Sequence, residues 1–588
     1  SSTINGVGIN VIETGSILIS NDGGTGTISS ALRNTGFGFE VFDDLTSGDD
    51  NTGVGRKALT KLTTGGGNTA VGSGSLTTHT TGDSNTAFGV SSLAANTTAS
   101  NNTAVGSSAL AANTTGTRNV AVGSGALDAN TTASYNIAIG YNSLGVNTTG
   151  EENISIGDGA LDANTTGDKN TALGTSSLGA NTTASNNTAV GYASLNANTT
   201  GTENVALGAN ALDANTTGSY NVALGSHSLT TDTLGARNVA IGRSALQAQN
   251  FTSATDSYNI GVGYAAGAAV TTGVQNTLIG GLAGDSLTTS NSNTVVGYEA
   301  LSTATNFSEN TAIGYRSQKV SSSGHSNTSL GHETLLALNS GTLNVAVGHD
   351  AGKAVTSGIK NTLIGALAGD ALTDADNNTA IGYFALSADT LGSKSTAIGQ
   401  GTLFAQNFTS ATDTFNTAVG YTAGVAVTTG VQNTLIGALA GDALTDADHN
   451  VAVGLNALTS DTLGSKSTAI GTGALGTQNF TSATNVYNTA VGYDAGVAVT
   501  TGINNTFIGG LAGDAVTTAS YSVAVGQGAA TNTTTSSQGF TAVGADSLFT
   551  NTTGTDNVAV GRASMYSNTT GSNNAAVGRS ALQANTTG

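Results

Sequence analysis

The sequence predicts an all-β chain, a parallel β-solenoid of 17-residue coils, and three observations lead to this fold class. A motif such as NTAVGSSALAANTTGTR, residues 102–118, occurs 32 times, and 27 of the 31 spacings between successive copies are seventeen residues. The fifth position of every copy is Gly, and the fourth is always Val, Ile, Leu or Phe. Such a strict period is typical of solenoids, in which each repeat forms one coil that stacks on the next.

Each coil is expected to begin with a strand of about five residues. Positions 2 and 4 of the motif, both β-branched or apolar in most copies, would lie on one face of this strand, with the small Ala of position 3 on the other. The Gly of position 5 would end the strand, because it permits a bend or a close backbone approach. The residues predicted to carry the stack, two coils taken as examples, are Gly106, Val105, Leu110, Gly123, Val122 and Leu127.

The segment between this Gly and the polar corner NTTG could form a helix or a second strand. Ala and Leu favour a helix, but only six or seven residues separate the Gly from the corner, and a helix that short is marginal. We therefore expect a second short strand that ends in the Leu of position 9, followed by a turn at NTTG. With coils about 4.8 Å apart, 32 of them predict a rod of roughly 150 Å.

Four segments follow from the repeat pattern. Residues 1–33 precede the repeats and are predicted to be an N-terminal cap or junction, with strand in GINVIETGSILIS. Residues 34–258 hold regular repeats. Residues 259–539 are diversified, with pairs of copies that have Gly in place of Leu at position 9 and with insertions at QNFTSAT. Residues 540–588 return to the NTTG type, and we expect the array to continue beyond them.

Composition excludes some partners and suggests another. The formal charge is −20, with 36 acidic residues and 16 scattered basic ones, so binding to nucleic acid or to an anionic membrane surface is disfavoured. No apolar run is long enough for a helix that spans a bilayer. Each coil has only two or three large apolar side chains and the chain has no Cys. We therefore predict a homotrimer, in which three coils share an axis and each gains another buried face.

The strings NTAVGSSAL, STAIGTGAL and SVAVG resemble the repeat of YadA-like head domains of trimeric autotransporter adhesins. Similar repeats occur in the shafts of bacteriophage tail fibres. The resemblance covers residues 34–588 and implies a trimeric, left-handed parallel β-roll. The repeat of this chain is longer than the usual repeat of that family, and its Asn lies one place nearer the Ala.

These features predict a structural role, with no enzymatic activity and no cofactor. We expect the shaft of a phage tail fibre on the virion, with an attachment protein at one end and a receptor-binding tip, outside this chain, that contacts a host receptor or glycan. The alternative is a trimeric adhesin on an extracellular bacterial surface, whose coils themselves bind a host or matrix ligand.

Two groups of side chains are candidates for a metal site. His332 and His349 occupy position 6 of consecutive coils, each followed by an acid, so they would lie about 5 Å apart. The segment GDALTDAD brings Asp370, Asp374 and Asp376 together in sequence, with a spacing that matches neither an EF-hand nor the nonapeptide calcium repeat. We interpret both groups as solvated polar surface and predict no metal site.

One pair of acids is a candidate for glycan cleavage. Asp128 and Asp162 share position 10 two coils apart, about 10 Å by strand spacing, at or just beyond the upper limit for an inverting glycosidase. Equivalent Asp residues are scattered along the chain without other cleft residues. We therefore predict no catalytic residue.

Overall fold

The structure is a computed structural model of the chain, and the residues that it describes are 2–4, 7–12, 16–20, 30–534 and 539–588. Over these ranges the chain is a parallel β-solenoid of about 32 turns, without a helix, which confirms the predicted fold class. No helix in the described part of the chain is long and apolar enough to cross a membrane. The chain divides into two compact units, Ser1–Ser292 and Asn293–Gly588.

The first unit starts with three strands that lead into the solenoid. Strand β1 (Ser2–Ile4) pairs antiparallel with β2 (Val7–Ile12), which pairs antiparallel with β3 (Ser16–Ser20). Strand β3 then pairs in parallel with β4 (Thr35–Phe37), the first strand of the repeats. The predicted strand region GINVIETGSILIS thus contains most of β2 and all of β3, while its residues 13–15 lie outside the described residues.

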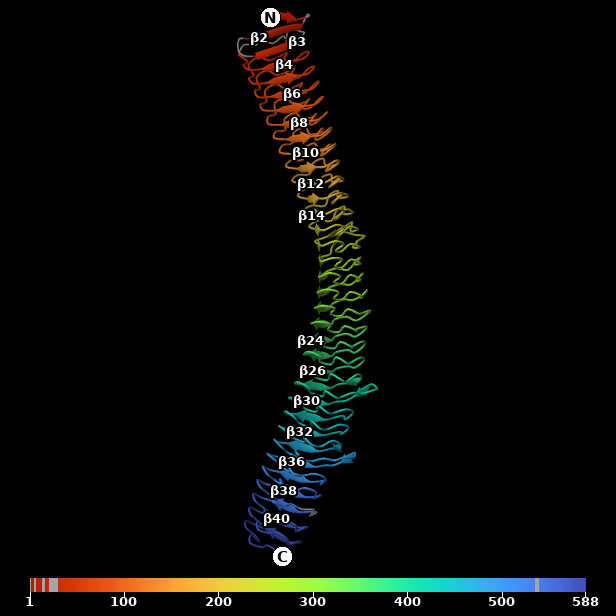
Figure 1. The fold of residues 1–588 in the computed structure, drawn as a ribbon, viewed down its shortest axis with the longest axis vertical. Helices are drawn as coiled ribbons and strands as arrows, with labels where there is room; N and C mark the ends of the chain where they lie inside the picture. The colour runs from red at the N-terminus through yellow and green to blue at the C-terminus, as the bar shows by residue number, and fades with distance from the viewer. Residues whose placement is uncertain (1, 5–6, 13–15, 21–29, 535–538) are drawn as a thin grey trace. The chain divides into compact units, whose positions relative to one another are not determined.

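Successive coils of the first unit contribute one strand each to a parallel ladder (Figure 1). Equal motif positions lie opposite each other from coil to coil. For example, Ala104 lies opposite Ala121. These strands are β4, β5 (Thr52–Val54), β6 (Thr69–Val71), β7 (Thr86–Phe88), β8 (Thr103–Val105), β9 (Val120–Val122), β10 (Ile137–Ile139), β11 (Ile154–Ile156), β12 (Thr171–Leu173), β13 (Thr188–Val190), β14 (Val205–Leu207), β15 (Val222–Leu224), β17 (Val239–Ile241), β19 (Ile260–Val262) and β20 (Thr277–Ile279).

The second unit has the same parallel ladder. Its strands are β21 (Thr294–Val296), β22 (Thr311–Ile313), β23 (Thr328–Leu330), β24 (Val345–Val347), β25 (Thr362–Ile364), β26 (Thr379–Ile381), β28 (Thr396–Ile398), β30 (Thr417–Val419), β31 (Thr434–Ile436), β32 (Val451–Val453), β34 (Thr468–Ile470), β36 (Thr489–Val491), β37 (Thr506–Ile508), β38 (Val523–Val525), β39 (Thr541–Val543), β40 (Val558–Val560) and β41 (Ala575–Val577).

Each QNFTSAT insertion adds a small two-stranded parallel sheet beside the main ladder. The pairs are β16 (Gly235–Ala236) with β18 (Thr255–Asp256), β27 (Gly392–Ser393) with β29 (Thr412–Asp413), and β33 (Gly464–Ser465) with β35 (Thr484–Asn485). The three insertions therefore fold alike, as their shared sequence indicates.

The strand of each coil is three residues long, shorter than expected, and its Ala faces the interior. Ala104 is fully buried, whereas Val105 and Val122 are half-buried and lie on the outer face of the sheet. The sequence predicts that Val105 and Val122 help to carry the stack, but in the single chain they lie outside the interior. Leu110 and Leu127 do lie in the interior, fully buried. The interior is narrow, so it accepts Ala on the strand side and Leu from the opposite wall.

The segment that ends in Leu110 is a series of turns, and the expected second strand does not form. Ser108 and Leu110 both have left-handed backbones, with φ of 57° and 56°, so the chain cannot extend there. The backbone still bonds to the next coil, because the Leu110 N–H donates to the Ala126 carbonyl at 2.9 Å. Such bonds between coils offset the cost of a left-handed Leu.

The Gly of position 5 has a backbone that other residues rarely adopt, and it faces the next coil closely. Gly106 has φ of 137°, and a Cβ atom there would lie 2.4 Å from the carbonyl oxygen of Gly123. No heavy atom fits at that distance. Both the conformation and the contact thus require Gly.

The Asn residues of the NTTG corners are buried and form a ladder inside the stack. Asn130 donates its Nδ2 hydrogen to Oδ1 of Asn113 at 2.9 Å and also to the Ala133 carbonyl at 3.0 Å. The corner therefore contributes a continuous row of amide hydrogen bonds in addition to its turn.

In the coils with Gly at position 9, the interior volume is redistributed between positions. In the coil that begins at Asn361, Leu363 occupies the interior side of the strand and Leu372 replaces the corner Asn, and both are fully buried. A Cβ atom at Gly369 would lie 2.8 Å from both of these Leu side chains. Gly at position 9 thus makes room for the larger residues.

Candidate functional site

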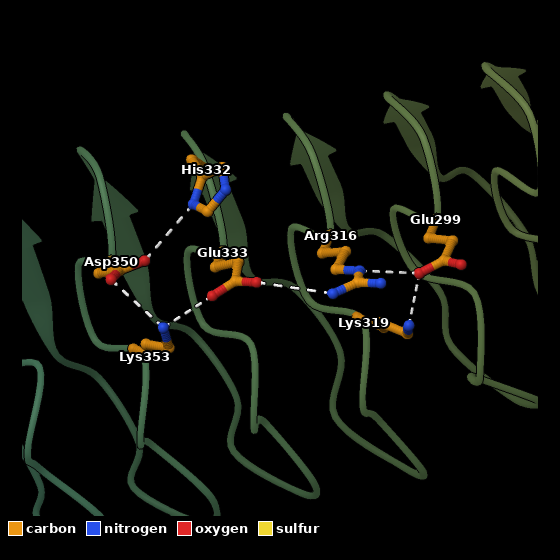
Figure 2. A network of polar contacts seen from close by, with 7 residues as sticks. All are labelled: Glu299, Arg316, Lys319, His332, Glu333, Asp350 and Lys353. Atoms are coloured by element: carbon orange, nitrogen blue, oxygen red, sulfur yellow. Dashed lines mark hydrogen bonds and ion pairs between the residues drawn. The ribbon is translucent and has the colours of Figure 1, made fainter.

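A group of charged side chains in the second unit forms a row at motif position 7, drawn in Figure 2. The row consists of Glu299, Arg316, Glu333 and Asp350, each with a left-handed backbone at φ between 49° and 57°. The same backbone conformation in four consecutive coils directs the four side chains alike. Opposite charges therefore come within ion-pair distance from coil to coil.

Ion pairs link the members of this row. Arg316 Nε lies 2.8 Å from Glu299 Oε2, and the Lys319 ammonium contacts the same oxygen. Lys353 Nζ lies 2.7 Å from Glu333 Oε2 and 3.3 Å from Asp350 Oδ2. Each Lys thus bonds to a carboxylate of the row, as Figure 2 shows.

The ion pairs shift the pKa values of the carboxyl groups in the expected direction. The hydrogen bond from Lys319 lowers the pKa of Glu299 to about 2. The hydrogen bond from Lys353 lowers the pKa of Glu333, and Glu333 in turn raises the pKa of Lys353. Glu299 and Glu333 are therefore ionised at neutral pH.

A second row, at motif position 6, is made of stacked rings. Tyr298 and Tyr315 stack at 5.9 Å between ring centroids, Tyr315 and His332 at 5.1 Å, and His332 and His349 at 4.7 Å. The last two rings are almost parallel, at 3°. The separation of about 5 Å expected between the two His side chains from strand spacing is therefore present.

The two rows meet at Asp350. His332 Nδ1 lies 3.6 Å from Asp350 Oδ1, and His349 Nδ1 lies 3.5 Å from Asp350 Oδ2. In the described part of the chain, these three residues are the one group of three or more His, Cys, Asp or Glu side chains whose ligand atoms converge. Asp350 follows His349 in sequence, but only its left-handed backbone and the stacking of the coils bring it to both rings.

The Asp residues of GDALTDAD do not converge. Asp374 accepts a hydrogen bond from Ser357 Oγ at 2.6 Å, and Asp376 accepts one from the Ile359 N–H at 2.8 Å. Asp370 accepts a hydrogen bond from Ser387 at 2.7 Å, in the following coil. Each carboxylate thus has its own partner in a neighbouring coil, and the three are not arranged as one set of ligands.

Asp128 and Asp162 do line one hollow, of about 230 Å³, together with Asn142, Gly145 and Val146. The hollow exists because Gly145 occupies position 10 of the coil between them and has no side chain there. Partial burial raises the pKa of both carboxyl groups. Asp128 and Asp162 are the two titratable groups among the five lining residues.

A larger hollow, about 410 Å³, lies beside the first QNFTSAT insertion and was not among the sequence candidates. Arg237 lies over the Tyr220 ring at 5.0 Å and over the Tyr258 ring at 5.8 Å, and its Nε lies 3.1 Å from Asp256 Oδ2. The hydroxyl groups of Thr217 and other lining residues add hydrogen-bonding capacity. The QNFTSAT insertion was the feature of the sequence that could have indicated this hollow. The residues that line the hollow come from three separate coils, which the sequence alone does not bring together.

No protein-family model matches the chain, and no curated protein matches it either. Function is therefore inferred from the repeat and from the contacts of its side chains.

Proposed function

We propose that the chain is a structural shaft of a fibre on a virion, most simply a phage tail fibre. The observation that supports this proposal is that successive coils bond to each other through the strand ladder. Coils with Leu at position 9 and Asn at the corner also bond through the left-handed Leu and the buried Asn ladder. Such a stack would act by its length, holding the parts at its two ends at a fixed distance. At about 4.8 Å per coil, each unit spans roughly 70–80 Å.

We also propose that the shaft is a homotrimer, joined through the outer face of the strands. Positions 2 and 4 of the repeat hold no charged residue in any copy. Several of these side chains are strongly exposed in the single chain, for example Phe88 at 57% and Leu207 at 46%. An uncharged stripe of this kind favours burial against a partner. A partner must repeat at the same spacing as the coils, and another copy of this chain does so. The resemblance to trimeric head domains favours three copies.

Light scattering coupled to size-exclusion chromatography tests the trimer. We expect a particle of three times the chain mass of 57.3 kDa. Leu207→Lys should dissociate it, because the charge would be buried without a partner. Thr200→Lys, at an exposed corner of the neighbouring coil, should leave it intact. A monomer or a dimer for the unaltered chain would contradict the proposal.

The place of the shaft is tested on particles. Under our proposal, antibodies against this chain label fibres of purified virions by electron microscopy, with one end at an attachment protein and the other at a receptor-binding tip. Labelling of a bacterial surface in place of virions would support the adhesin.

The hollow beside Arg237 is the specific observation that favours the adhesin as a second candidate. The hollow is lined by one aromatic ring, a guanidinium, a carboxylate and hydroxyl groups, which are suited to a polar ligand such as a glycan. Binding of the purified chain to immobilised glycans, abolished by Arg237→Ala and retained by Arg56→Ala, would support ligand binding by the coils. Absence of binding would contradict the adhesin and leave the structural shaft as the proposed function.

A further inference from the structure

We propose that His332, His349 and Asp350 form a binding site for one divalent transition-metal ion of the Zn²⁺ type. Each residue offers one ligand atom, and these atoms all lie within 4.8 Å of one another. The three side chains come from the two adjacent coils that contain β23 and β24. A bound ion would therefore fasten one coil to the next, which goes beyond the role of a passive shaft.

The distances suit two ligands of one ion better than a hydrogen bond. The Nδ1 atoms of His332 and His349 lie 3.6 and 3.5 Å from the two oxygens of Asp350. An N–H···O hydrogen bond is shorter, about 2.7–3.2 Å. Two ligand atoms at about 2.0–2.1 Å from a tetrahedral Zn²⁺ are separated by roughly 3.4 Å. Each of these two separations, to a different carboxylate oxygen, lies close to the edge of such a tetrahedron. Because the whole set of ligand atoms lies only within 4.8 Å, the side chains would rotate slightly to close around one ion.

Asp350 has an oxygen available for this purpose. Its side chain is only 13% exposed, and Oδ1 is buried and accepts no hydrogen bond from any described residue. Lys353 lies 3.3 Å from the other oxygen, Oδ2, and thereby orients the carboxylate. A buried carboxylate oxygen without a hydrogen bond carries a desolvation cost that a cation would remove.

The ligand types select the class of ion. Two imidazole nitrogens with one carboxylate oxygen suit Zn²⁺, Ni²⁺ or Cu²⁺, whereas Ca²⁺ and Mg²⁺ prefer sets of oxygen ligands. The His332 and His349 side chains are 45% and 60% exposed. An ion can therefore enter from solvent, and water can complete its coordination. The alternative is that the two rings simply extend the stack of Tyr298 and Tyr315.

Isothermal titration of the full chain with ZnCl₂ at pH 7.5, in a buffer that does not chelate metal, tests this proposal. We expect one saturable Zn²⁺ per chain, no saturable Ca²⁺ binding at this group, and at least a tenfold loss of Zn²⁺ affinity in His332→Asn and in His349→Asn. His325→Asn, an exposed His in the same unit, is the matched control and should bind as the unaltered chain does.

Replacement of Zn²⁺ by Co²⁺ gives a second readout that reports on the ligands directly. We expect visible absorption bands of four-coordinate Co²⁺ in the unaltered chain and their loss in Asp350→Asn. Circular dichroism checks that each variant is folded; if Asp350→Asn is not, the two His variants decide. The proposal is overturned by absence of saturable Zn²⁺ binding, by unchanged affinity in either His variant, or by an equal loss in His325→Asn.

Discussion

The backbone N–H of Asn119 donates a hydrogen bond to Oδ1 of Asn102, one coil earlier, at 2.9 Å. Asn119 repeats the relationship with the next coil, since its own Oδ1 accepts the N–H of Asn136 at 2.9 Å. Its Nδ2 donates to the Ala133 carbonyl at 2.8 Å. Through its backbone N–H and its buried side chain, Asn119 therefore joins three coils, and the order of each coil depends on its neighbours.

Asn119→Ala should destabilise the first unit by about 1–3 kcal/mol, because it leaves the Asn136 N–H buried without its partner. The Ala133 carbonyl keeps the hydrogen bond from Asn130 Nδ2. Urea unfolding followed by circular dichroism measures the change. Thr115→Ala, at an exposed corner of the preceding coil, is the control and should stay within about 0.5 kcal/mol of the unaltered chain. Equal midpoints for both variants would show that the Asn ladder does not stabilise the stack.

Two adjacent glycines test the close approach between coils. Gly509 has φ of 130°, and a Cβ atom there would lie 2.6 Å from the Gly526 carbonyl, whereas a Cβ atom at Gly510 meets nothing within 4 Å. We expect Gly509→Ala to destabilise the second unit by at least about 3 kcal/mol, from backbone strain and displacement of the next coil. Gly510→Ala should be nearly neutral in thermal unfolding. Similar losses of stability in both variants would mean that replacing Gly is destabilising by itself and that the close contact with the next coil is not the cause.

The sequence predicted the coil, its length and its parallel stacking because these depend on features that recur in each copy. Gly106 and its equivalents are invariant. This invariance indicates that every coil has the same backbone conformation and the same close contact at this position. The strict period also argued against helices and against domains with a different fold within the repeats. The 17-residue period also implied that equal positions, such as Ala104 and Ala121, would lie opposite each other.

The sequence could not show which face of the strand is inside. An alternation of Thr or Val with Ala suggests by size that Val105 is buried, yet Ala104 occupies the interior. The width of the interior decides this, and that width depends on the turns opposite. Those turns were unpredictable too, because a left-handed Leu such as Leu110 opposes local preference. Hydrogen bonds to the next coil stabilise it, and only the three-dimensional stack reveals them.

The sequence predicted part of the candidate metal site. His332 and His349 share a repeat position, so their proximity followed from the period alone. Asp350 followed His349 in the chain, but adjacent residues usually point apart. Its approach to both rings depends on φ of 57°, which the sequence does not reveal.

The exchange of interior volume between Leu363 and Gly369 can be tested with a double-mutant cycle. Gly369→Leu alone should destabilise by about 1–3 kcal/mol through overpacking, and Leu363→Ala alone by about 2–5 kcal/mol through a cavity. The double variant should lose less than the sum, with a coupling of about 0.5–3 kcal/mol. Position 9 already accepts Leu with the same backbone in other coils, such as Leu386.

Gly369→Leu combined with Leu548→Ala, a distant buried Leu of the same unit, is the matched control for that cycle. Its two effects should add. Additive effects in the Leu363 pair as well would contradict the proposed exchange of volume.

A buried His replaces Asn in one rung of the corner ladder and should make the first unit sensitive to acid. His79 Nε2 donates to the Gly82 carbonyl at 2.7 Å, and Nδ1 accepts from Asn96 Nδ2 at 2.9 Å. A second proton on Nδ1 would therefore face a donor. Burial lowers the pKa of His79 below its ordinary value.

Because the folded chain disfavours protonated His79 while the unfolded chain does not, this residue should cost stability as pH falls below about 6.5 and cost none above it. The expected slope approaches 1.4 kcal/mol per pH unit until the lowered pKa is reached. His79→Asn places the usual ladder residue there and should remove this part of the loss. Urea midpoints between pH 8 and pH 5.5 measure the difference, and His227→Asn, a partly exposed His of the same unit, should keep the acid loss. Parallel pH curves for the unaltered chain and His79→Asn would show that folding does not lower the pKa of His79.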